Sequence, residues 1–161
     1  MRIGVVSDTH DNARNVERIV EVLRGAEVER LVHTGDVTRG RTLETLTRLG
    51  VPIFGVYGNN DVLRDEFDEV AVRHEIFFAE PPVEFRWDGR NILVVHDPLD
   101  IEPALRDDHG LVLHGHNHRR VVDRTEDRLT FNPGECAGQM EGRNAVGVVD
   151  LATLEPEVLL F

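Results

Sequence analysis

The chain has 161 residues, of which 40% are hydrophobic and 30% charged, a composition that fits one compact domain over residues 1–161 and excludes a disordered chain. Its 18 basic and 30 acidic residues give a net charge of −12, which disfavours nucleic acid as a partner because so acidic a surface repels a polyanion. No apolar run approaches the ~20 residues of a membrane helix and no signal-peptide pattern opens the chain, so we expect neither membrane contact nor secretion.

The first strand and helix are predicted near the N-terminus. Residues 3–6 form a short apolar run that is typical of a buried strand, and the run ends at Ser7-Asp8-Thr9-His10. A helix is predicted between the cap-like Asp11-Asn12 and Gly25. Its apolar residues recur at helical spacing and are Val16, Ile19, Val20 and Leu23.

The same pattern occurs twice more in the first half. A strand at residues 30–33 ends in Thr34-Gly35-Asp36, and a helix before Gly50 is marked by Leu43, Leu46 and Leu49. A third strand, residues 52–57, ends in Gly58-Asn59-Asn60-Asp61. Three strand–helix units in series predict a parallel sheet covered by helices.

The second half favours hairpins. Residues 83–87 alternate in polarity, a turn at residues 88–89 follows, and the strand at 92–95 ends in His96-Asp97. Further strands are predicted at residues 111–113, 121–122, 129–131, 145–149 and 158–160. We therefore expect an α/β fold with two mixed sheets packed face to face and helices outside.

Side chains that bind metals cluster where the predicted strands end. They are Asp8, His10, Asp36, Asn59, His96, His116 and His118. Because ligands in α/β proteins bind beyond the carboxyl ends of the strands, five separate segments are expected to converge on one crevice. Carboxylate, imidazole and amide groups without thiolates suit divalent manganese, iron, nickel or zinc.

The motifs resemble those of the calcineurin-like metallophosphoesterase family and occur in the same order. They are Ser7-Asp8-Thr9-His10, Gly35-Asp36, Gly58-Asn59-x-Asp61, His96 and Gly115-His116-Asn117-His118. Within that family the chain is similar to the small, cap-free phosphodiesterases of the YfcE type and their archaeal relatives, a likeness to which residues 131–136 add.

The resemblance implies a four-layer αββα sandwich that holds two metal ions. It implies that Asp8, His10 and His118 hold the first ion. It further implies that Asn59, His96 and His116 hold the second ion and that Asp36 bridges the two. We expect Mn²⁺, with Ni²⁺, Fe²⁺ or Zn²⁺ as alternatives.

The activity expected from this resemblance is hydrolysis of a small-molecule phosphodiester. A hydroxide that bridges two ions would attack phosphorus in line with the leaving group. Asp36, Asn59 and His96 are the expected catalytic residues.

Two positions depart from the family pattern. Phosphomonoesterases of the family carry His after the Gly-Asn pair, where it can protonate a leaving group, whereas this chain has Asn60, whose amide is no acid near neutral pH. Relatives of the YfcE type often have a glycine-histidine step after the residue equivalent to His96, and here Asp97-Pro98 follows.

Other functions stay open beside the phosphodiesterase. One is a phosphomonoesterase or nucleotide pyrophosphatase, against which Asn60 argues. Another is a non-catalytic scaffold similar to the small retromer subunit, against which the intact set of metal ligands argues. A nuclease lacks support because the chain has neither a cap domain nor a basic stripe.

The remaining histidines and Asp61 have structural interpretations. Asp61 is expected to be a helix N-cap rather than a group that orients a ligand. His33 is expected in the core or behind the ligands, and His74 and His109 at the surface. His114 lies two residues before His116 on the same face of a strand, and whether it lines the pocket stays open.

Three features of the second half also have structural interpretations. Asn132 is expected in a turn, and Cys136 as a small buried side chain. The alternating face of Val83, Phe85 and Trp87 is expected in the core or, on an edge hairpin, in the contact of a homo-oligomer.

The composition also indicates an environment. A single cysteine, Cys136, cannot form an internal disulfide, which favours the cytoplasm. All 18 basic residues are arginine, and an acidic chain without lysine suits concentrated salt, where the Debye length falls to ~3 Å at 1 M. Codon bias in a GC-rich genome is the alternative; it explains the missing lysine but not the acidic excess.

Overall fold

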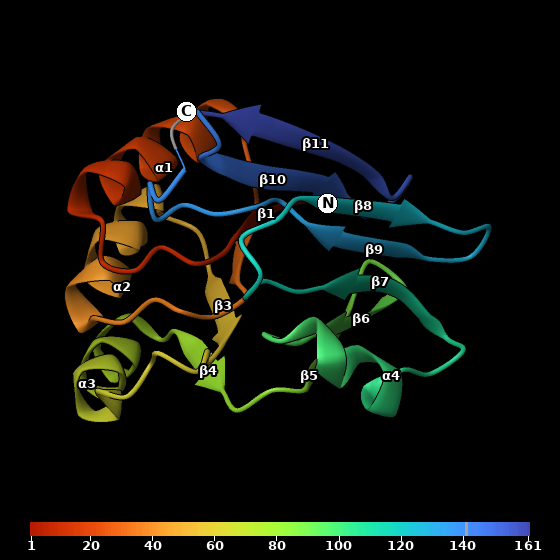
Figure 1. The fold of residues 1–161 in the computed structure, drawn as a ribbon, viewed down its shortest axis with the longest axis horizontal. Coiled ribbons are helices and arrows are strands. Elements are labelled where there is room, and N and C mark those ends of the chain that lie inside the picture. The colour runs from red at the N-terminus through yellow and green to blue at the C-terminus, as the bar shows by residue number, and fades with distance from the viewer. Residues whose placement is uncertain (141) are drawn as a thin grey trace.

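Two β-sheets pack face to face in the computed structural model, which describes residues 1–140 and 142–161 (Figure 1). The first sheet has the strand order β11-β10-β1-β2-β3-β4. Its strands are β1 (Arg2–Val6), β2 (Arg30–His33), β3 (Ile53–Val56), β4 (Phe77–Ala79), β10 (Ala145–Asp150) and β11 (Glu155–Leu160). Strands β1 to β3 run parallel, as predicted, β4 also runs parallel to them, and the closing hairpin β10–β11 adds two antiparallel strands.

The second sheet has the order β5-β6-β7-β9-β8. Its strands are β5 (Val83–Trp87), β6 (Arg90–Val94), β7 (His109–Leu113), β8 (Val121–Arg124) and β9 (Leu129–Asn132). The inner strands β6, β7 and β9 are parallel, and the edge strands β5 and β8 pair antiparallel to them. Both sheets are therefore mixed, which confirms the prediction.

Helices cover the outer face of each sheet unequally, and the four predicted layers are present (Figure 1). The first sheet is covered by α1 (Ala13–Gly25), α2 (Gly40–Leu46), the 3₁₀ turn η1 (Thr47–Leu49) and α3 (Arg64–His74). The second carries, within residues 1–140 and 142–161, only the 3₁₀ turn η2 (Pro98–Asp100) and α4 (Ile101–Ala104). Within the described residues, no helix has the length and apolar character needed to cross a bilayer.

The apolar runs found in the sequence become the core. Along β1, Ile3 and Val5 face the second sheet while Val6 packs under the helices, because successive side chains of a strand point to opposite faces. The predicted helix after Asn12 buries the expected Val16, Ile19, Val20 and Leu23, and the Asn12 side chain caps it by accepting from the Asn15 amide at 3.2 Å. These contacts fix the sheet on which the candidate ligands stand.

The alternating face of β5 belongs to the core. Trp87 is 9% exposed, and Val83 and Phe85 pack against the inter-sheet cluster, with the rings of Phe85 and Trp87 stacked at a centroid distance of 4.6 Å. The guanidinium of Arg30 lies 4.7 Å from the Trp87 ring centre. Of the two interpretations of this face, the structure supports the core.

Some elements and one residue differ from expectation. The short elements β4 and α4 were not predicted, because three or four residues carry too little periodicity. The surface position predicted for His109 is wrong: it is 1% exposed, and its Nδ1 accepts from the Arg106 amide at 3.0 Å. His74 is exposed, as predicted.

Strand β10 must pass close to a buried ring. A Cβ at Gly147 would overlap the ring of Phe131, which is 0% exposed and has no free volume to move into. We predict that Gly147→Ala lowers the free energy of unfolding by ~1–3 kcal/mol through overpacking. Urea unfolding of the variant and of the unmodified protein measures this.

Gly25→Ala is the matched control, since a Cβ at this exposed end of α1 meets no atom within 4 Å. It should leave stability unchanged or raise it by up to ~1 kcal/mol. Equal unfolding midpoints for the two variants would contradict the packing argument.

Candidate metal centre

The seven candidate ligands meet at one edge of the molecule. Asp8 and His10 follow β1, Asp36 follows β2, and Asn59 follows β3. From the second sheet, His96 follows β6 and the pair His116 and His118 follows β7. The carboxyl ends of the parallel strands of both sheets point to this edge, which is why segments far apart in sequence converge (Figure 1).

Five of these residues have left-handed backbone. Their φ angles are 52° for Asp8, 42° for His10, 59° for Asp36, 70° for His116 and 55° for His118. Non-glycine residues in this region carry strain of ~1–3 kcal/mol each and gather at functional sites. The fold therefore holds these side chains in place at a conformational cost.

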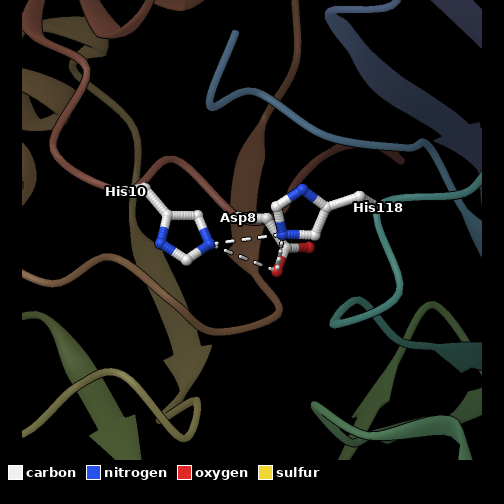
Figure 2. A group of neighbouring side chains, drawn as sticks. All are labelled: Asp8, His10 and His118. Atoms are coloured by element: carbon white, nitrogen blue, oxygen red, sulfur yellow. Dashed lines mark hydrogen bonds and ion pairs between the residues drawn. The ribbon is translucent and has the colours of Figure 1, made fainter. Parts of the chain in front are cut away.

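Asp8, His10 and His118 form one group (Figure 2). The Nε2 atoms of the two histidines are 3.3 Å apart, and Asp8 Oδ1 lies 3.4 Å from Nε2 of His118 and 4.0 Å from Nε2 of His10. Asp8 is fully buried, and its Oδ1 has no hydrogen-bond partner among the described residues. One carboxylate oxygen and two imidazole nitrogens thus face a common point.

Asn59, His96 and His116 form a second group. Asn59 Oδ1 lies 3.0 Å from both His96 Nε2 and His116 Nδ1, and these two nitrogens are 3.2 Å apart. His116 therefore faces the group with Nδ1, whereas His96 uses Nε2. The other ring nitrogen of His116, Nε2, lies 3.7 Å from a carboxylate oxygen of Asp97.

Asp36 stands between the two groups. Its Oδ2 is 3.4 Å from Nε2 of His10, and its Oδ1 is 3.5 Å from Nε2 of His96. Burial opposes ionisation of this carboxyl, but the neighbouring imidazole of His96 and the hydrogen bonds from Asn60 outweigh it and hold its pKa below the usual range. Asp36 is thus an ionised carboxylate that presents one oxygen to each group.

The residues present fit a cation at each group. Nδ1 of His96 lies 2.8 Å from the carbonyl oxygen of Thr34, which only accepts, so this nitrogen carries the hydrogen and Nε2 has a free lone pair. Nδ1 of His118 likewise lies 3.2 Å from a carboxylate oxygen of Glu135. Such a partner fixes the tautomer of a metal-binding histidine. With the unpartnered oxygen of Asp8, these lone pairs have the chemistry of a ligand set.

Sequence reasoning missed the part played by Glu135. Its carboxylate is fully buried and, besides His118, accepts from the backbone amides of Gln139 at 3.2 Å and Met140 at 2.7 Å. In the sequence, Glu135 stands out only as part of the family likeness of residues 131–136. A glutamate next to Gly134 near a histidine motif is too common a pattern to predict this contact.

The role predicted for Asp61 is wrong. Helix α3 begins at Arg64 with Leu63 as N-cap. The carboxylate of Asp61 instead accepts from the backbone amides of Asp36 at 2.9 Å, Thr38 at 2.6 Å and Gly58 at 2.7 Å. It joins the loops that carry Asp36 and Asn59, and this long-range tie has no local sequence signal.

Asn60 faces Asp36. Its backbone amide donates to Asp36 Oδ1 at 2.9 Å and its side-chain amide donates to Asp36 Oδ2 at 2.7 Å. Gly58 permits this approach, because a Cβ there would overlap the Asp36 carboxylate. The residue at the position of the family's proton donor therefore supports the shared carboxylate.

Two other histidines lie behind the site. His33 is fully buried, its Nδ1 accepts from the Gly35 amide at 3.2 Å, and its Nε2 lies 3.2 Å from Thr9 Oγ1, so the core position is confirmed. His114 is 2% exposed and contacts the Gly115 carbonyl oxygen at 3.4 Å. It is not among the residues lining the cavity described below, which answers the question that the sequence left open.

Asn132 and Cys136 are both fully buried. The Asn132 side chain donates to the Gly115 carbonyl oxygen at 3.1 Å and accepts from the Gly134 amide at 2.9 Å, so the expected turn residue also braces the loop before His116. Cys136 is a free thiol whose pKa is raised by burial. It has the structural role predicted.

A cavity of about 550 Å³ opens beside the second group. Asn59, His96 and His116 form its inner wall, and Tyr57, Val62 and Pro81 give it apolar surface. Asp97, Asp100, Arg64 and Glu80 also line it, with Arg64 paired to Glu80 at 2.9 Å. A substituent of a molecule bound at the centre has room here.

The chain is similar to known phosphoesterases. Residues 1–154 match the model of the calcineurin-like phosphoesterase superfamily domain. A phosphodiesterase of Methanocaldococcus jannaschii is 30% identical over 154 residues, with 93% of each chain covered. The structure of a novel archaeal phosphodiesterase covers 100% of both chains at a TM-score of 0.90 and 28% identity. The phosphoesterase YfcE of E. coli has a TM-score of 0.74 at 19% identity over 99% of this chain and 98% of its own, a likeness of fold.

The buried His33 generates a prediction about pH. Burial lowers its pKa from 6.5 to about 3, so between these values the unfolded chain binds a proton that the folded chain does not. Stability contributed by neutral His33 is therefore complete above about pH 6.5 and lost as the pH falls, by up to ~1.4 kcal/mol per pH unit. His33→Gln should remove this part of the slope in urea unfolding of metal-free protein between about pH 6 and 4.

His74→Gln is the control, because His74 is exposed and its loss should leave the slope as it is. An unchanged slope in His33→Gln would show that the histidine is protonated in the folded protein.

Proposed function

The chain belongs to the calcineurin-like phosphoesterase superfamily, hydrolases that act on phosphoester bonds, and we propose that it is a phosphodiesterase that uses two divalent metal ions. We take the whole chain as one catalytic domain. In this proposal Asp8, His10 and His118 hold one ion, and Asn59, His96 and His116 hold the other. The curated archaeal relative named as a phosphodiesterase supports the choice of substrate bond.

The position of Asp36 carries the proposal. Its two oxygens lie 3.4 Å and 3.5 Å from nitrogens of His10 and His96, which belong to different groups. A carboxylate can serve two ions at once, whereas each imidazole lone pair serves one. Two buried carboxylates, Asp8 and Asp36, leave a pair of divalent ions with net positive charge, which attracts a phosphate ester to an otherwise acidic protein.

The chain's own groups prepare the reaction. When bound, the ions polarise the phosphoryl oxygens and lower the pKa of water, so that hydroxide is present near neutral pH. Thr34 and Glu135 hold the rings of His96 and His118 with their free lone pairs toward the centre. Asp61 fixes the loops of Asp36 and Asn59 against each other. This preorganisation keeps the donor atoms in place between turnovers.

Hydrolysis joins the oxygen of water to phosphorus and breaks the bond from phosphorus to the leaving oxygen. One proton of the water passes to solvent, and the leaving group departs as an anion or takes a proton from solvent. Asn60 supplies no proton to the leaving group, since its side-chain amide donates a hydrogen bond to Asp36 and is not acidic near neutral pH. Good substrates therefore have leaving groups that are stable as anions.

The alternatives are less well supported. A phosphomonoesterase or nucleotide pyrophosphatase with a basic leaving group needs an acid, and Asn60 faces Asp36 instead. A non-catalytic scaffold does not explain why seven metal-binding side chains converge, five of them at positions with strained backbone.

We also propose the finer features of this activity. Mn²⁺ is the proposed ion, with Ni²⁺, Fe²⁺ or Zn²⁺ as alternatives, because oxygen and imidazole nitrogen ligands without thiolate suit these ions. The substrate is a small phosphodiester rather than nucleic acid, given the net charge of −12. The absence of lysine and the acidic excess fit a cytoplasm rich in salt.

Loss of the shared carboxylate should affect both ions. We predict that purified protein loaded with Mn²⁺ holds two ions per chain and that Asp36→Ala retains neither, as measured by elemental analysis after gel filtration. Asp123→Ala, which removes an exposed aspartate of β8, should keep both. Full occupancy in Asp36→Ala would rule out the bridging role.

The leaving group should decide the rate. With Mn²⁺, we predict that aryl phosphodiesters such as bis(p-nitrophenyl) phosphate react at least about tenfold faster than alkyl phosphomonoesters, because Asn60 supplies no proton to the leaving oxygen. Asn60→His should raise the rate on monoesters. Equal rates on both substrate types in the unmodified protein would contradict the assignment, and no hydrolysis of any diester would overturn the proposed function.

A further inference from the structure

A second cavity beside the metal centre is rich in arginine. It measures about 410 Å³ and is lined by His118, Arg119, Arg120 and Arg143, together with Gly134, Gly142 and Leu160. Three of the chain's 18 basic residues meet here, although the net charge is −12. This local reversal of charge lies directly against one of the candidate ligands.

The fold assembles the cluster from separate loops. Arg119 and Arg120 follow His118, whereas Arg143 precedes β10. Buried Asn132 holds the first loop, since its amide donates to Asn117 Oδ1 at 3.3 Å and its Oδ1 accepts from the Gly134 amide at 2.9 Å. The arginines thus stand on a braced framework.

Their charges are not neutralised within the part of the chain that the structure describes. Arginines elsewhere pair with acids, for example Arg39 with Glu66 at 2.8 Å. Arg119, Arg120 and Arg143 form no ion pair with a described acidic residue. With the described residues, the only hydrogen bond that their side chains form is a long one, 3.5 Å, from Arg120 Nε to the Pro133 carbonyl oxygen. Adjacent like charges repel, and an anion placed between them relieves the repulsion.

The two sides of the centre have opposite charge. The arginine cavity shares His118 with the first group, whereas the larger cavity shares His96 and His116 with the second. That larger cavity carries Asp97 and Asp100, and its single arginine is already paired with a glutamate. A phosphodiester has two arms, and an anionic arm fits only the His118 side.

We propose that the arginine cavity binds a second phosphate group, so that the substrates are phosphodiesters with a further phosphate on one arm. This inference rests on the proposed function. Three guanidinium groups match the charge and the oxygen geometry of a phosphate dianion better than those of a single carboxylate. The other arm, with the leaving oxygen, then lies toward Tyr57, Val62 and Pro81.

A matched pair of chromogenic esters tests the proposal. Thymidine 5′-(p-nitrophenyl phosphate) is compared with the same ester carrying a 3′-phosphate, at low ionic strength with Mn²⁺. We expect KM to be about tenfold lower for the ester with the 3′-phosphate. The ratio should fall toward one in the double variant Arg119→Gln/Arg143→Gln and in molar salt. Both arginines are exposed, so the variant should fold, which its melting temperature checks.

The double variant Arg14→Gln/Arg86→Gln is the control, because it removes two exposed arginines, one of α1 and one of β5, that do not line the cavity, with the same change in net charge. It should keep the full ratio. A ratio near one in the unmodified protein, or a ratio that survives the double variant, would overturn the proposal.

Calorimetry separates this proposal from the proposed function. Thymidine 3′,5′-bisphosphate should bind the Mn²⁺-loaded protein about tenfold more tightly than thymidine 5′-phosphate, and the double variant should lose this difference. If neither ester is hydrolysed but the difference in binding is found, the phosphodiesterase assignment fails and the phosphate site stands. If hydrolysis occurs without any difference in binding, the reverse holds.

Discussion

One buried carboxylate, Asp36, has to remain ionised between two groups of metal-binding side chains. Burial alone would favour its neutral form, and the neighbouring imidazole of His96 and the hydrogen bonds from Asn60 prevent this. Its position also determines the distance between the two groups, because each of its oxygens faces a histidine of a different group. Hydrogen bonds from the loop that carries Asn60 hold this carboxylate in place.

The supporting contacts come from positions outside the ligand set. Asp61 gathers three backbone amides of the loops around Asp36 and Asn59. Glu135 and Thr34 set the tautomers of His118 and His96. Buried groups of this kind are effective because a hydrogen bond is stronger in a low dielectric, and because leaving one unpaired is costly. The strained backbone at five candidate ligands is tolerated within this framework.

The two sides of the metal centre differ in charge. Most of the surface repels anions, and the arginines beside His118 form a local exception in a chain of net charge −12. Asp97 and Asp100 lie in the cavity on the other side. This asymmetry would orient the proposed two-phosphate substrate at close range, where screening by salt is least effective.

The sequence by itself determined the strands other than β4, their order along the chain and the candidate ligands, because each apolar run stops at a polar motif and periodicity is a local property. It determined neither the buried position of His109 nor the contacts of Asp61, Asn60 and Glu135. The arginine cavity also joins residues 118–120 to Arg143, which no motif connects. Those features depend on contacts between segments distant in the chain, and only the packing of the two sheets decides which loops meet.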